Sequence, residues 1–512
     1  MCVRPPTVGE SPYRPRAPAL GLLHRVVREW LAAFRELRPD LPFHVVQAFE
    51  EFLDCGILAN GFTRLRCADC GHERLLPFSC KGRLCPSCNG RRMIETAAHL
   101  VDRVLPPAPY RQWVLSLPRR VRYLLVTRKE LLAPVLEVYL RTLWAWQRRR
   151  ARKLGVEKPL TGSITCLQRF GDALNLNLHF HAFLPDGVFF READTGPILF
   201  QTLPPPTVDD LDELVLKLWR RINKKLKTLG AWEPELEDEL DSERHELGRA
   251  VSEQLVAFDP DDEEAFERKG LSAFRFGYSL HAGVAVEAHD REGLERILRY
   301  GLRPPFASGR LEEGPRGELY YRLRKPLRDG RTMLVLEPKD LLRRLANFVP
   351  PKGQNQVRYH GVFAPNSKHR PALALLAARA AADTASPPRP TPALPEGEGQ
   401  ARPRGRAGEG PIQKSVCRAE APLEVRPRRI PWAELLKRTF QVDLTICEGC
   451  GGRVEVLAVI TDPRVIRRIL KHLHLATNPP PRGSVTLGAR GPPGGALDAG
   501  PSIDDLLMDE QP

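Results

Sequence analysis

Two cysteine pairs with the same spacing constrain the fold of this chain more than any other feature of its sequence. Cys67-x-x-Cys70 and Cys85-x-x-Cys88 are separated by fourteen residues. Each pair can bring two thiolates to one ion at about 2.3 Å, so two pairs complete a tetrahedral structural zinc site with no position left for water. Further candidate ligands are Cys80 as the alternate, Cys55 and His72. We therefore predict a zinc-stabilised domain here; the alternative is a set of unrelated buried thiols.

A third pair, Cys447-x-x-Cys450, is less specific because no second CxxC pair follows it. Cys417, His472 or His474 could complete a zinc site there, or the pair could be free of metal. The sequence leaves this question open.

The balance of charged residues favours a polyanionic partner. The 512 residues include 78 Lys and Arg against 63 Asp and Glu, a formal net charge of +15. A surplus of this size is typical of proteins that bind nucleic acid, ahead of those that bind anionic membranes, although ordinary basic proteins share it. Arg91 and Arg92, beside the cysteines, are predicted to contact DNA.

Neither a signal peptide nor a membrane span is predicted. The N-terminus is rich in Pro and Arg and has no apolar core segment. No run approaches the ~18 apolar residues that a membrane helix needs. We therefore expect a cytoplasmic protein without a membrane partner, in which reduced cysteines bind metal instead of forming disulfides.

Composition and apolar periodicity predict an α+β protein. The expected segments are a flexible N-terminus 1–19, a helical zinc-binding and DNA-contacting domain 20–106, a mixed domain 107–382, a disordered linker 383–427, a small CxxC-containing module 428–477 and a disordered tail 478–512. Within the mixed domain, a hairpin is predicted over 163–184, and Asp329-Gly330 is a strong turn signal for a second hairpin. The acidic stretch 233–264 is predicted to be a surface insertion.

His179 and His181 lie two residues apart in a predicted strand. Because alternate residues of a strand point to the same face, both imidazoles would converge while the residue between them points into the core. Two neutral histidines can hold a divalent cation and leave positions open for phosphate oxygens. Gln168, on the partner strand, would lie opposite His179 or its neighbour and is our candidate third ligand. The alternative is a solvent-facing polar pair on an edge strand.

Tyr300 is the candidate nucleophile. It lies late in a predicted helix, beside Arg299 and Arg303. A phenol with a pKa of ~10 is a poor nucleophile at neutral pH, and a metal or nearby cations would favour the phenolate. The alternative is a buried aromatic on the apolar face of that helix.

Taken together, these motifs resemble those of rolling-circle transposases of the insertion-sequence-91 family, including the common-region elements, which belong to the HUH endonucleases. The likeness covers roughly positions 20 to 375. It rests on FSCKGRLCPSC at 78–88 with Arg91 and Arg92, QWVLSLP at 112–118, QRFG at 168–171, HFH at 179–181, DG at 186–187, SLHAG at 279–283, HDREG at 289–293, RY at 299–300, RPP at 303–305 and VRYHGVFAP at 357–365.

The resemblance implies a fold and a set of roles. It implies a central antiparallel sheet flanked by helices, with the His-x-His strand in its middle. His179 and His181 match the histidines that bind Mg or Mn, and Tyr300 matches the nucleophile that forms a 5′-phosphotyrosine and frees a 3′-hydroxyl. The cysteines match the family's N-terminal zinc-binding domain, and the expected location becomes the bacterial cytosol, at the nucleoid.

One departure from the family pattern bears on mechanism. Some members carry two tyrosines four residues apart in this helix, whereas here the earlier position is Arg296. A second subunit, in a homodimer, or reuse of Tyr300 would be needed to finish strand transfer.

The function expected from the resemblance is nicking and rejoining of single-stranded or hairpin DNA at element ends. Arg299, Arg303, Lys352 and Arg358 are predicted to hold the DNA backbone. Two alternatives remain: a plasmid-type replication initiator or relaxase with the same chemistry, and a zinc-dependent DNA-binding protein without catalysis.

Overall fold

The computed structural model describes residues 21–193, 196–231, 270–327, 329–385, 443 and 445–483. The expected N-terminal segment 1–19, the acidic stretch 233–264 and residues 484–512 of the expected tail lie outside the described residues. So does the expected linker, except that helix α10 (Arg370–Ala385) extends three residues into it. None of the helices in the described part is long and apolar enough to span a bilayer.

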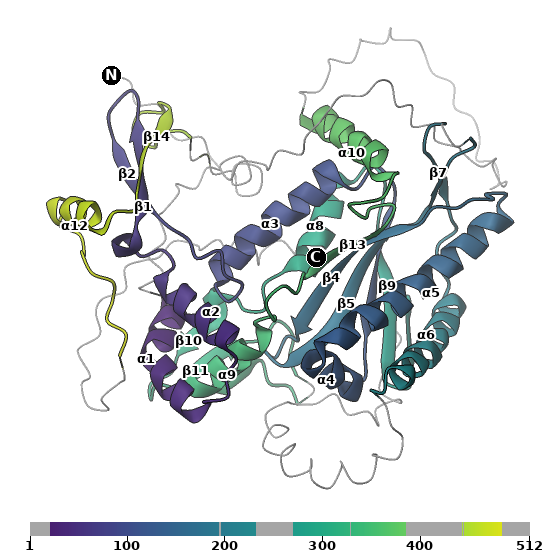
Figure 1. The fold of residues 1–512 in the computed structure, drawn as a ribbon, viewed down its shortest axis with the longest axis horizontal. Coiled ribbons are helices and arrows are strands. Elements are labelled where there is room, and N and C mark those ends of the chain that lie inside the picture. The colour runs from purple at the N-terminus through teal and green to yellow at the C-terminus, as the bar shows by residue number, and fades with distance from the viewer. Residues whose placement is uncertain are drawn as a thin grey trace, which may run out of the picture.

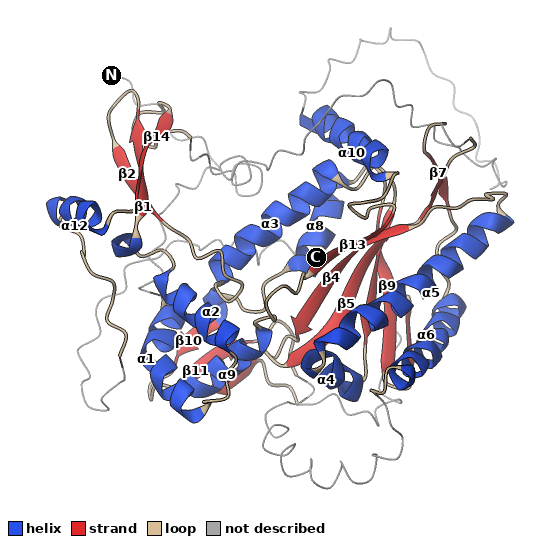
Figure 2. Ribbon diagram, in the orientation of Figure 1, coloured by secondary structure: helices blue, strands red, loops and turns tan. Residues whose placement is uncertain are grey.

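A six-stranded sheet forms the centre of the protein (Figures 1 and 2). Its spatial order is β13-β4-β5-β3-β9-β8, and each neighbouring pair is antiparallel. The strands are β3 (Tyr110–Ser116), β4 (Gly162–Phe170), β5 (Leu176–Pro185), β8 (Ser272–Arg275), β9 (Tyr278–Val286) and β13 (Val357–Gly361). The expected α+β class and central antiparallel sheet are confirmed.

Helices cover both faces of this sheet because each strand alternates between two apolar cores. On one face Trp113, Phe180 and Leu280 pack with α4 (Arg119–Thr127), α5 (Leu132–Lys153) and α6 (Val208–Thr228). On the other, Phe183 and Leu298 belong to a core shared with α3 (Pro86–Arg103), α8 (Arg291–Leu302) and α10. Burying each such side chain contributes about 1.5–3 kcal/mol, so two cores hold the sheet rigidly.

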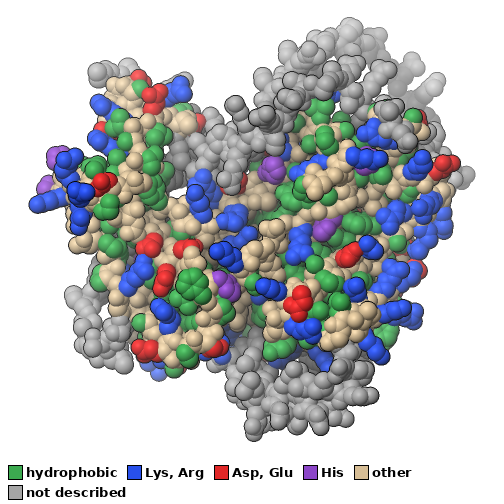
Figure 3. Space-filling view, in the orientation of Figure 1, with side chains coloured by type: hydrophobic (Ala, Val, Ile, Leu, Met, Phe, Trp, Pro, Cys, Tyr) green, Lys and Arg blue, Asp and Glu red, His purple; other side chains and the backbone are tan. Residues whose placement is uncertain are grey.

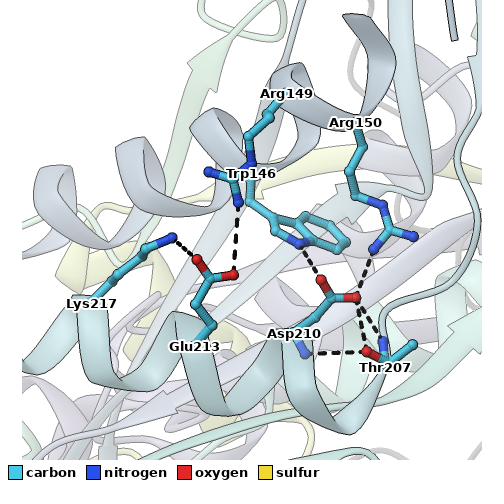
Figure 4. Close-up of polar contacts among 7 residues, drawn as sticks. All are labelled: Trp146, Arg149, Arg150, Thr207, Asp210, Glu213 and Lys217. Carbon is cyan, nitrogen blue, oxygen red and sulfur yellow. Dashed lines mark hydrogen bonds and ion pairs between the residues drawn. The ribbon is translucent and has the colours of Figure 1, made fainter. Parts of the chain in front are cut away.

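Polar contacts fix α6 against α5 (Figure 4). Thr207 and Asp210 form a capping box that satisfies free N–H groups at the start of α6. Asp210 also accepts hydrogen bonds from Trp146 Nε1 at 3.0 Å and from Arg150 Nη1 at 2.7 Å. The Asp210 carboxylate thus caps the N-terminus of α6 and also bonds this helix to α5.

The N-terminal helices share a core with a later part of the chain. Helices α1 (Leu22–Leu37) and α2 (Phe43–Asp54) pack with α9 (Pro338–Phe348) and with a small sheet. That sheet contains β10 (Leu311–Glu313), β11 (Leu319–Arg322) and β12 (Met333–Leu336), and the β11–β12 pairing confirms the predicted second hairpin. The predicted boundary at 106 therefore does not separate two independent cores.

A second lobe combines an early and a late segment of the chain. β14 (Val454–Ile460), in the expected C-terminal module, pairs with β1 (Phe62–Cys67), which pairs with β2 (Glu73–Pro77). Helix α12 (Pro463–His472) packs Ile466 and Leu470 against Phe62. The remaining elements are β6 (Gly187–Phe190), β7 (Leu199–Thr202), η2 (Leu58–Asn60), η3 (Lys129–Leu131) and η6 (Ser308–Arg310).

Candidate functional site

The two histidines of the His-x-His motif lie in the middle of the central sheet. His179 and His181 are on β5, which pairs with β4 on one side and β3 on the other, so the edge-strand alternative is excluded. Their ring centroids are 4.8 Å apart and both side chains are buried. Phe180 points to the opposite face and joins the core there. The strand therefore presents both imidazoles on the face covered by α8.

Burial keeps both imidazoles neutral. It lowers the pKa of His179 to about 4 and the pKa of His181 well below its ordinary value. His179 Nδ1 lies 2.8 Å from the carbonyl oxygen of Asn177, so this nitrogen is the donor and Nε2 keeps a lone pair. His181 Nε2 is buried and has no hydrogen-bond partner among the described residues. Two nitrogen lone pairs are thus available on one face.

Gln112 on β3 contacts the other nitrogen of His181. Its Nε2 lies 2.6 Å from His181 Nδ1. The oxygen and nitrogen of such an amide are interchangeable by a flip, and with Oε1 toward the ring it accepts the Nδ1 proton and leaves Nε2 unprotonated. Sequence reasoning missed the role of this residue, although it begins the QWVLSLP motif at 112–118.

Gln168 places a third candidate ligand atom, its Oε1, near the two histidines. It lies opposite His179 in the β4–β5 register, as the hairpin predicted. Its Nε2 donates to the backbone carbonyls of Tyr300 and Gly301 at 2.9 Å each, whereas its Oε1 is buried without a partner in the described chain. Two imidazole nitrogens and an unpaired buried amide oxygen fit a divalent cation with open positions.

Tyr300 lies at the end of α8, directly over this site. The Asp290 carboxylate begins α8 by accepting from the N–H of Gly293 at 2.7 Å. Gly301 lets the helix approach the sheet, because a Cβ there would lie 2.7 Å from Phe183. The Tyr300 ring is edge-on to His181, with 5.9 Å between centroids, and is 37% exposed. The buried-aromatic alternative is therefore excluded.

Arg303 also contacts the Tyr300 ring. Its guanidinium carbon is 4.6 Å from the ring centroid, and it pairs with Asp172 at 3.2 Å. Arg324 also lies close enough to Tyr300 and Arg303 to interact electrostatically with both. The phenol ring thus contacts both His181 and the Arg303 guanidinium.

A cavity of ≈ 670 Å³ adjoins the site. Its cationic lining residues are Lys81, Arg83, Arg91, Arg92, Arg169 and Arg303, and Gln168 and Gly301 line it as well. Of the predicted DNA contacts, Arg91, Arg92 and Arg303 lie here. Arg299 is on α8, Lys352 is exposed and Arg358 is half-buried on β13, and none of the three lines the cavity. Lys and Arg side chains are also much more frequent than Asp and Glu on the face shown in Figure 3.

Two arginines in this cavity are shielded from water: Arg169 is buried and Arg83 is half-buried. Burial lowers the pKa of Arg83 and of Arg169 to about 10, so both remain charged near neutral pH. Their guanidinium groups donate to neutral side-chain amides, Arg83 to Gln356 and Arg169 to Gln354. A buried cation held by neutral groups is costly and is stabilised when an anion enters. Sequence reasoning did not single out Arg169.

The structure corrects the predicted zinc ligand set. Cys67 and Cys70 are not grouped with Cys85 and Cys88, because the β1–β2 strands lie in the second lobe while Cys85 begins α3. The first cluster instead consists of Cys55, Cys80, Cys85 and Cys88. Its sulfur atoms are 3.6–3.7 Å apart in the Cys55–Cys88, Cys80–Cys88 and Cys55–Cys85 pairs. His72 belongs to neither cysteine group.

Two segments of the chain match known protein families. Residues 26–117 match a family described as "Transposase zinc-binding domain", and residues 162–370 match one described as "Putative transposase". The chain is therefore a transposase with a zinc-binding domain. More narrowly, the zinc-binding family is that of insertion-sequence-91 transposases, and the two matches together support a transposase of this type. No significant match is found among curated proteins or among solved structures.

Proposed function

We propose that this transposase nicks and rejoins single-stranded DNA at element ends through a 5′-phosphotyrosine on Tyr300, in the manner of HUH endonucleases. The observation that carries the proposal is the position of the Tyr300 ring, which is 37% exposed and whose centroid lies 5.9 Å from that of the His181 ring. Gln168 links the two parts, since it binds the end of α8 and faces His179. The matches to transposase families favour this function over a replication initiator.

His179, His181 and Gln168 would hold a magnesium or manganese ion. When bound, such an ion polarises the scissile phosphate and offsets the charge that develops on it. The chain's own contribution is preorganisation: the imidazoles are already neutral, and Asn177 and Gln112 fix their ring orientation.

In the proposed step, the Tyr300 oxygen attacks phosphorus and the bond from phosphorus to the 3′ oxygen breaks. The phenol loses a proton and the leaving 3′ oxygen gains one, so the step is balanced. Arg303, whose guanidinium lies over the phenol ring, favours the developing phenolate. Rejoining reverses the step, by reuse of Tyr300 or with a tyrosine from a second subunit, because position 296 is an arginine.

A direct assay tests the proposal. End-labelled single-stranded and hairpin oligonucleotides from an element end are incubated with the protein and a series of divalent ions. We expect a denaturation-resistant protein–DNA adduct that requires Mg²⁺ or Mn²⁺, and mass spectrometry should locate the nucleotide on Tyr300. Binding of DNA without cleavage under every metal condition would instead support the non-catalytic alternative.

Loss of the Gln168 oxygen should weaken metal use. We expect Gln168→Met to raise the Mg²⁺ concentration needed for half-maximal cleavage by about 10–100-fold. The substitution removes the buried Oε1 atom, which is the proposed third ligand of the ion. The control is Gln147→Met on α5, whose side chain also donates to a buried carbonyl, that of Pro185 at 2.7 Å, but on the far side of the sheet. An unchanged Mg²⁺ requirement in Gln168→Met would exclude it as a ligand.

The buried cavity arginines should bind the DNA backbone. We expect Arg83→Gln and Arg169→Gln each to lower affinity for single-stranded DNA by about tenfold and to reduce the slope of log affinity against log salt by about one. Arg149→Gln is the control, because Arg149 is half-exposed on α5 and faces Glu213. Fluorescence anisotropy over a salt series gives both quantities, and equal slopes in all three variants would contradict this assignment.

A further inference from the structure

We propose that a second zinc ion binds between an early and a late segment of the chain, held by Cys67, Cys70, Cys447 and Cys450. The ion would make the zinc-binding domain a composite of residues near the N-terminus and residues nearly 400 positions later. This inference is independent of the nuclease chemistry, since the four thiols lie in the lobe formed by β1, β2 and β14.

The separations between the sulfur atoms are those of a tetrahedral zinc site. Cys67 Sγ lies 3.5 Å from Cys450 Sγ, and Cys70 Sγ lies 3.7 Å from Cys447 Sγ. All four ligand atoms are within 4.8 Å of one another. Zinc–thiolate bonds of about 2.3 Å in tetrahedral geometry place sulfur atoms about 3.8 Å apart. A disulfide would need about 2.05 Å, and all four cysteines are free.

The two cysteine pairs form turns with the same backbone geometry. In the first, Gly71 N–H donates to Cys67 O and Cys67 N–H donates to His72 O. In the second, Gly451 N–H donates to Cys447 O and Cys447 N–H donates to Gly452 O. Gly71 and Gly451 have φ angles of +71° and +74°, so both turns use glycine at the same left-handed position. Two matched turns that face each other are the arrangement of a closed two-turn zinc site.

Further contacts align the two turns. β1 pairs with β14 so that Cys67 lies opposite Val454, and Ala68 N–H donates to Arg453 O at 2.9 Å. Arg74 and Glu448 form an ion pair at 3.1 Å. Figure 1 shows the same arrangement, with the purple strands β1 and β2 beside the yellow β14. The first cluster does not contribute to this arrangement, because its four cysteines already form a complete set of zinc ligands.

Zinc stoichiometry in the full-length protein tests the proposal. We expect two zinc ions per chain by elemental analysis, and X-ray absorption on the same sample should give four sulfur neighbours per zinc. The variant Cys447→Ser/Cys450→Ser should retain one zinc, and cobalt substitution should give about half the thiolate charge-transfer absorbance. The matched control is Cys166→Ser, which removes a buried thiol of β4 that belongs to neither group and should keep two zinc ions.

One zinc per wild-type chain would overturn the proposal, as would two zinc ions retained by the double variant. Nitrogen or oxygen neighbours at half of the wild-type zinc would also overturn it, and this measurement does not depend on whether any variant folds. None of these outcomes bears on Tyr300, so the proposed function would stand or fall separately.

Discussion

Tyr300→Phe will abolish the covalent protein–DNA adduct and lower strand cleavage by on the order of 10³-fold or more, because the substitution removes the attacking oxygen. The ring itself, between His181 and Arg303, keeps its packing contacts, so the affinity for single-stranded DNA should change by less than about twofold. Gel analysis of labelled oligonucleotide after denaturation measures the adduct, and anisotropy measures binding on the same preparation.

Tyr123→Phe is the matched control for this experiment. Tyr123 lies on α4 and is 56% exposed, so its hydroxyl is as accessible to DNA as that of Tyr300 but lies on the far side of the sheet. We expect full adduct formation in this variant. An adduct that persists in Tyr300→Phe and disappears in another tyrosine variant would reassign the nucleophile, whereas cleavage without any adduct would point to water as the attacking group.

The parts of the site that depend on local patterns could be predicted from the sequence. The predicted hairpin turn places Gln168 opposite His179 or its neighbour, and in the structure it pairs with His179. The alternation of His179, Phe180 and His181 assigned each side chain to a face. Tyr300 could be placed late in a helix because apolar residues recur at helical spacing before it. That the helix end lies over β5 depends on Gly301, which no local pattern reveals.

The partition of the cysteines could not be predicted, because CxxC spacing shows which residues form a turn but not which turns share an ion. Cys70 and Cys85 are close in sequence, yet their clusters differ, since β14 pairs with β1 and brings Cys447 to Cys70. Pairing between strands about 390 residues apart leaves no local signal. The buried arginines were hard to find for the same reason: Arg169 faces a cavity built from three distant segments.

The first cysteine cluster is linked to the proposed nuclease site through the packing of two helices. Cys85 and Cys88 lie at the start of α3, and α3 packs along α8, whose last turn carries Tyr300. Lys81 and Arg83 of the same cysteine-rich segment line the cavity beside Gln168. The zinc-binding domain therefore contributes one wall of the cavity beside Gln168.

His181→Ala will lower metal-dependent cleavage by about 10³-fold, because losing a ligand forfeits on the order of 4 kcal/mol of charge stabilisation at the phosphate. His181 is the stronger test of the two histidines. Its Nε2 has no alternative partner in the described residues, and its ring lies directly beneath Tyr300. DNA binding should persist, since the cavity arginines are untouched, so the loss should appear in the cleavage rate at saturating DNA.

The matched control is His360→Ala on β13, at the edge of the same sheet. Burial lowers the pKa of His360 to about 4, as for His179, and its Nε2 is also buried without a partner in the described chain, but its ring packs on Trp144. Loss of buried packing alone would lower the thermal stability of both variants and leave cleavage per folded molecule intact. If His181→Ala cleaves DNA as fast as His360→Ala at saturating Mg²⁺, the imidazole pair has no metal role, and the ring contact with Tyr300 must serve only to position the helix.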